Sequence, residues 1–109
     1  MVHERAHEIF DGLTAQLTSL PDVALGRMFG TVGLGVRGKI FAFVGSGGDL
    51  IVKVGERRAA ELVADGTAER TVMRGREMRE WLSLRIEQDE LWAPLMSEAH
   101  DFVDTITPH

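Results

Sequence analysis

The middle of the chain constrains the fold most, because it alternates short apolar runs with glycine. Residues 26–54 contain eight glycines and no proline. Three β-rich runs, residues 33–36, 39–44 and 49–54, lie between the glycines. Apolar runs of this length, bounded by turn-forming residues, are typical of strands joined by hairpins. The segment therefore predicts an antiparallel meander of three strands.

Apolar residues recur at three- and four-residue steps on both sides of the meander, which predicts helices. The first helix is expected over residues 2–20 and ends before Pro21, because a residue that precedes proline is pushed out of the α region. A second helix is expected over residues 55–65. A third is expected over residues 89–106, with Asp89 as its N-cap.

Two further strands are expected between the second and third helices, over residues 67–74 and 78–86. The predicted fold class is therefore α+β: a two-layer α/β sandwich with the order α-β(3)-α-β(2)-α and an antiparallel sheet. A chain of 109 residues is about one domain long. We expect a single domain over residues 1–109.

The composition excludes several classes of protein. Hydrophobic residues make up 44% and charged residues 27% of the chain, as in an ordinary globular domain. Cysteine is absent, which excludes disulfides, thiol catalysis and thiolate metal sites. No apolar run approaches the roughly 20 residues of a membrane helix. The first ten residues lack the pattern of a signal peptide, so we expect a cytoplasmic protein.

Five runs of residues together carry a family resemblance. They are RMFG at 27–30, GL at 33–34, GKIFA at 38–42, LIVKV at 50–54 and MRGREMREW at 73–81. In these runs the chain resembles the TfoX N-terminal domain family, over about residues 5–106. The resemblance implies a two-layer fold of the same order, similar to secretion chaperones and YjbR-like proteins. It implies no catalytic residues, and the family is named after a regulator of bacterial natural competence.

We therefore expect a non-catalytic regulatory or accessory protein that acts through protein contacts, in transcription or competence regulation. A sheet with helices on one side only would leave Ile51 and Trp81 exposed on the other. Exposed apolar patches usually mark interfaces, so we expect a homodimer through the sheet or its edge, besides a protein partner. Trp92, like Trp81, is interpreted as a packing residue.

The one recognisable catalytic pattern is HExxH, formed by His3, Glu4 and His7. In zinc hydrolases this spacing places both imidazoles on one metal ion and uses the glutamate as general base. Here the pattern lies at the end of the first helix, where helices fray and no sheet frames a cleft. We interpret it as a helix surface and expect no cofactor. A zinc-binding protein or hydrolase that uses His3 and His7 is the alternative.

Charge is distributed unevenly along the chain. Residues 23–58 hold six bases and two acids, whereas residues 87–109 hold six acids and no Lys or Arg. If the acidic helices cover one side of the sheet, the other side is comparatively positive. The candidate anion- or partner-binding residues are Arg27, Lys39, Lys53, Arg74, Arg76 and Arg79. A nucleic-acid or small-anion binder is thus a second alternative, although the net charge of −5 predicts weak or absent binding to duplex DNA.

Overall fold

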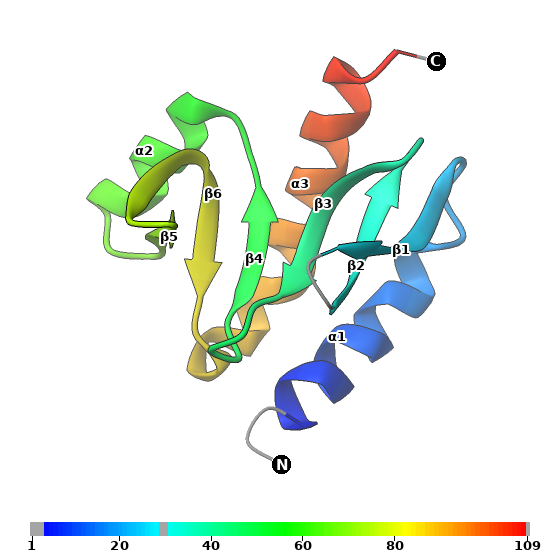
Figure 1. Ribbon diagram of the computed structural model, residues 1–109, viewed down its shortest axis with the longest axis horizontal. Helices are drawn as coiled ribbons and strands as arrows, with labels where there is room; N and C mark the ends of the chain where they lie inside the picture. Colours follow the sequence, from blue (N-terminus) through cyan, green and yellow to red (C-terminus); the bar gives the residue numbers. More distant parts are fainter. Residues whose placement is uncertain (1–3, 29–30, 109) are drawn as a thin grey trace.

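The computed structural model describes residues 4–28 and 31–108, which form helices packed on one sheet (Figure 1). The elements are α1 (Glu4–Leu17), β1 (Val23–Met28), β2 (Thr31–Val36), β3 (Lys39–Val44), β4 (Leu50–Lys53), α2 (Glu56–Ala64), β5 (Glu69–Met73), β6 (Arg76–Leu84), the 3₁₀ helix η1 (Ile86–Leu91) and α3 (Trp92–Ile106). The strands lie in the order β1-β2-β3-β4-β6-β5, and every neighbouring pair is antiparallel. The predicted α+β fold is confirmed.

The helices bury their apolar residues against one face of the sheet. Side chains of α1, α2 and α3 join the same core cluster as alternate residues of β2, β3, β4 and β6. On the sheet these include Leu34, Ala42, Val52 and Leu82, which are paired across the strands and share one face. The expected two-layer arrangement follows, with the opposite face of the sheet free of helices.

Four strands precede α2, where the sequence predicted three. The additional strand, β1, pairs with β2 from Val23↔Val36 to Met28↔Thr31. Its sequence, VALGRM, is short and carries a glycine, so periodicity alone does not separate it from a loop. The pairing with β2 decides its conformation, and the order is corrected to α-β(4)-α-β(2)-α.

The helix ends also differ from the predicted ones. The first helix ends at Leu17, three residues before the expected end. Asp89 lies inside η1 and does not cap α3, whose N-cap is Leu91 without a side-chain hydrogen bond. Pro94 is the third residue of α3, where its missing N–H costs no intrahelical bond.

The middle of the core is built on α3. Trp92, Leu95, Met96, Ala99 and Val103 are buried on its inner side, beneath β2, β3 and β4. Trp92 is 0% exposed, and its indole Nε1 donates a hydrogen bond to the Arg85 carbonyl over 3.2 Å. Its predicted packing role is confirmed.

The helix-free face carries a small apolar cluster of its own. Ile51 is only 9% exposed, contrary to the expectation that this face would leave it open. Gly45 makes the burial possible, because a Cβ at that position would lie 2.6 Å from Cδ1 of Ile51. The ring of the half-buried Trp81 meets Phe43 edge-on, with 5.7 Å between centroids. Close packing within the chain thus covers much of this face.

A bulge in β3 depends on Gly35. The β2–β3 register changes from Leu34↔Ala42 to Gly35↔Ile40, so Phe41 is the extra residue and is fully buried. A Cβ on Gly35 would lie 2.9 Å from the Lys39 carbonyl oxygen and 3.2 Å from Cδ1 of Ile40. The backbone of the bulge therefore leaves no room for a side chain at position 35.

We therefore expect Gly35→Ala to lower the free energy of unfolding by about 1–3 kcal/mol, the usual cost of overpacking. Gly12→Ala is the matched control, because Gly12 is exposed inside α1 with nothing within 4 Å of an added Cβ. That change should raise the free energy of unfolding by about 0.5–1 kcal/mol through helix propensity. Urea unfolding followed by circular dichroism measures both. Equal effects of the two substitutions would contradict the role given to Gly35.

Candidate binding surface

Of the HExxH pattern, Glu4 and His7 lie at the start of α1. His7 is exposed, and His3 lies outside the described residues. Within residues 4–28 and 31–108, no three His, Asp or Glu side chains are grouped so that they could hold a metal ion. His100 is engaged elsewhere, with Nδ1 3.0 Å from Oδ1 of Asp101 and its ring edge-on against Phe41.

Two of the predicted bases, Lys53 on β4 and Arg79 on β6, have acidic partners. Lys53 is paired across the strands with Trp81, and its Nζ lies 5.7 Å from the centre of that ring. The same Nζ is 4.0 Å from a carboxylate oxygen of Glu80. Arg79, two residues before Trp81, lies 3.6 Å from Glu56 at the start of α2. These charges are therefore partly balanced within the chain.

The six predicted bases do not form one patch. Lys39 and Lys53 line the same hollow beside the C-terminal end of α3. Arg27 is exposed on β1, at the edge of the sheet farthest from β5. Arg74 and Arg76 lie at the opposite side, where β5 and β6 join.

The turn between β5 and β6 presents these two arginines. Arg74 has φ 52° and Gly75 has φ 77°, so both turn residues are in the left-handed region, as in a type I′ hairpin turn. Val72, beside the turn, is 61% exposed. Arg74 and Arg76 are exposed, and neither forms an ion pair with any carboxylate of the described residues. We call Val72, Arg74 and Arg76 the hairpin end.

A groove of about 700 Å³ adjoins the hairpin end. It runs from Val63 of α2 and the loop 66–68 to Arg70 and Val72 of β5, and continues to Arg85. Its lining mixes small apolar groups with two arginines and two glutamates, Glu69 and Glu77, so the charges of the groove itself are balanced.

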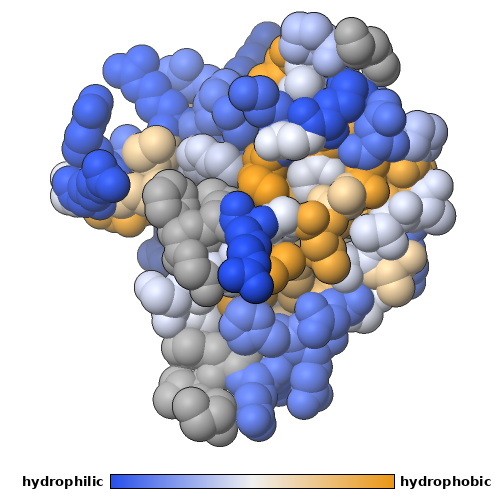
Figure 2. Space-filling model, turned by 45° about the vertical axis from the view of Figure 1, so that its right-hand side comes forward, coloured by the Kyte–Doolittle hydropathy of each residue, from blue (hydrophilic) through white to orange (hydrophobic). Residues whose placement is uncertain are grey.

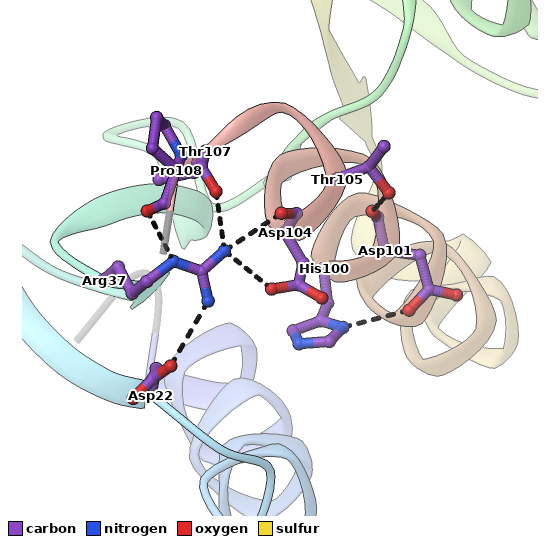
Figure 3. A network of polar contacts seen from close by, with 8 residues as sticks. All are labelled: Asp22, Arg37, His100, Asp101, Asp104, Thr105, Thr107 and Pro108. Carbon is purple, nitrogen blue, oxygen red and sulfur yellow. Dashed lines mark hydrogen bonds and ion pairs between the residues drawn. The ribbon is translucent and has the colours of Figure 1, made fainter.

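Arg37, in the β2–β3 turn, has an extensive set of polar contacts with other described residues (Figure 3). Its guanidinium donates to the carbonyl oxygens of Asp104, Thr107 and Pro108 over 2.9, 2.9 and 3.0 Å. It also donates to the carboxylates of Asp104 and Asp22, over 2.8 and 3.3 Å. The hydrogen bond that Arg37 donates to the Asp104 carboxylate is the main cause that raises the pKa of Arg37. The side chain joins the α1–β1 turn, the β2–β3 turn and the end of α3.

Arg37 was not among the predicted site residues. An Arg-Gly pair between two β runs does predict a tight turn, and Arg37 and Gly38 both have positive φ. The partners at the end of α3 are distant in sequence, so no local pattern points to them. This network is structural, since its donors and acceptors are used within the chain.

Comparison with known families agrees with the fold. A model of the TfoX N-terminal domain matches residues 15–102. The chain belongs to the TfoX N-terminal domain family. The match includes all strands of the sheet, α2, η1 and most of α3. No curated protein matches the chain. Among the described residues of this TfoX N-terminal domain, no helix has the length and apolar character needed to cross a membrane.

Proposed function

We propose that this TfoX N-terminal domain is a non-catalytic regulatory or accessory protein that binds an acidic surface of another protein. The hairpin end supports the proposal, because it combines an apolar side chain that is 61% exposed with two arginines that form no ion pair with the carboxylates of the described residues. Apolar contact supplies affinity, and unpaired charges select and attract the partner. The setting we propose is transcription or competence regulation, because the family is named after a regulator of bacterial natural competence.

The test compares the wild-type chain with a double variant, Arg74→Ala and Arg76→Ala. A protein captured from the native host is identified by mass spectrometry, purified, and titrated against both. The loss of two charge contacts should weaken binding to the partner about tenfold. Added salt should also weaken binding by the wild-type chain, because it screens the same contacts. A control with Arg5→Ala and Lys39→Ala removes two exposed bases elsewhere and should bind as the wild type does.

Equal binding by the wild type and the hairpin variant would contradict the proposal. Duplex DNA is titrated in parallel, and we expect a Kd no tighter than the usual non-specific range of about 10⁻⁴ to 10⁻⁶ M. Nanomolar, sequence-selective binding that the hairpin variant abolishes would instead assign the hairpin end to nucleic acid.

A further inference from the structure

The two edge strands of the sheet differ in how they are protected. Edge strands expose unpaired N–H and C=O groups, and proteins usually guard them with charges, prolines or bulges. β5 carries Glu69 and Arg70, and its register with β6 shifts between Arg70 and Val72. β1 carries Arg27 as its one charged residue and pairs with β2 in six consecutive steps without a shift. β1 is thus a regular edge with little protection.

Apolar side chains are exposed on and around β1. Leu25, in the middle of the strand, is 53% exposed, and Val32 on β2 is 45% exposed. The pairs Leu25↔Leu34 and Arg27↔Val32 place Leu25 and Val32 on the same face of the sheet as diagonal neighbours. Figure 2 turns the side of the molecule with β1, β2 and α1 toward the viewer and shows apolar surface in its middle.

The charges at the two ends of β1 are complementary to each other. Asp22 directly precedes the strand; its carboxylate accepts a hydrogen bond from Arg37, but its side chain is still 53% exposed and open to a second cation. Arg27 lies near the other end and is exposed. An antiparallel copy of the same strand would place each Arg27 at the end that carries Asp22 of the other copy. Opposite charges would then lie near each other at both ends.

We propose that β1 pairs with β1 of a second copy of this chain, antiparallel and about a two-fold axis at Leu25. Each Leu25 then lies opposite its counterpart, and each Arg27 opposite Val23 of the other copy. The two Arg27 residues are separated by about 13 Å along the strands, at 3.3–3.4 Å per residue, so like charges do not meet. The two sheets become one, and the exposed β1 edges of both copies are paired, whereas the β5 edges stay at its two ends. This inference goes beyond the proposed function, because the hairpin end lies at the other side of the sheet.

The absence of cysteine allows a direct test of this register. Directly opposite residues of antiparallel strands have Cα atoms about 4.5–5.5 Å apart, within the range that a disulfide spans. Leu25→Cys should therefore form a covalent dimer under mild oxidation. Arg27→Cys should not, because its counterpart is too distant, and Val72→Cys on β5 should not either.

Sedimentation of the cysteine-free chain completes the test. We expect a species of twice 12.0 kDa at about 100 µM, a concentration that populates a micromolar dimer. Leu25→Lys should give the single-chain mass and Val72→Lys should not, with circular dichroism showing that both remain folded. A wild-type chain that stays monomeric, or a disulfide at position 72 in place of 25, would overturn the inference.

The two proposals fail separately in these experiments. The double substitution of Arg74 and Arg76 should leave the dimer mass unchanged. Leu25→Lys should leave the binding of the acidic partner per chain unchanged.

Discussion

Trp92→Ala is expected to lower the free energy of unfolding by about 3–5 kcal/mol, the range seen when a large buried aromatic is truncated. Trp92 is fully buried between α3 and the sheet, so its removal leaves a cavity that the packed surroundings fill only in part. The Arg85 carbonyl also loses its indole donor. Since small domains are stable by only about 5–15 kcal/mol, this single change removes a large part of the total.

Trp81→Ala is the matched control for that prediction. Trp81 is half-buried on the helix-free face, where it contacts Phe43 and Lys53. Its loss should cost about 1–2 kcal/mol, because less apolar surface returns to water. Urea unfolding followed by far-ultraviolet circular dichroism compares the two variants without relying on tryptophan fluorescence. A Trp81 variant less stable than the Trp92 variant would contradict the assignment of the main core to the helix-covered face.

Arg37→Ala should lower the melting temperature more than the removal of any exposed arginine. The guanidinium satisfies three carbonyl oxygens at the end of α3, and its side chain is only 14% exposed. Without it, the carbonyl oxygens of Asp104 and Thr107 lose a charged donor, and two carboxylates lose their counter-charge. Hydrogen exchange should accelerate first in the last turn of α3.

Arg58→Ala is the control for Arg37. Arg58 also pairs with two carboxylates, of Glu98 and Glu61, but its side chain is 44% exposed and contacts no carbonyl group of a helix end. Exposed ion pairs of this kind contribute little to stability, so the melting temperature of the Arg58→Ala variant should stay close to that of the wild type. Arg37→Lys should recover only part of the loss, because an ammonium group lacks the planar set of five donors. Equal melting temperatures of the Arg37 and Arg58 variants would contradict the structural role given to Arg37.

The local signals in the sequence were sufficient for most of the fold. The apolar steps of α1 and α3, the Arg74-Gly75 turn and the alternation of β4 are all short-range patterns, and the structure contains each of them. The strand β1 was missed because pairing with β2, rather than its own residues, decides its conformation. The bulge that turns Phe41 into the core is likewise set by the approach of β3 to Gly35.

The candidate binding surfaces were harder to predict from the sequence than the fold. Charge counting identified Arg74 and Arg76, but it also grouped them with Arg27, which the strand order places at the other edge. Which bases have acidic partners depends on tertiary contacts, such as that between Arg79 and Glu56. The unprotected edge at β1 could be recognised only once the strand order was known.

The position of α3 in the chain also bears on how the protein is made. The helix that covers β2, β3 and β4 is translated after every strand of the sheet. At about 5–20 residues per second, the ribosome finishes β4 several seconds before α3 is complete. During that interval Leu34 and Val52 lack the cover of α3, and the edge of β1 is exposed to other nascent chains. We expect a chain of this design to depend on chaperones that shield the sheet until α3 arrives.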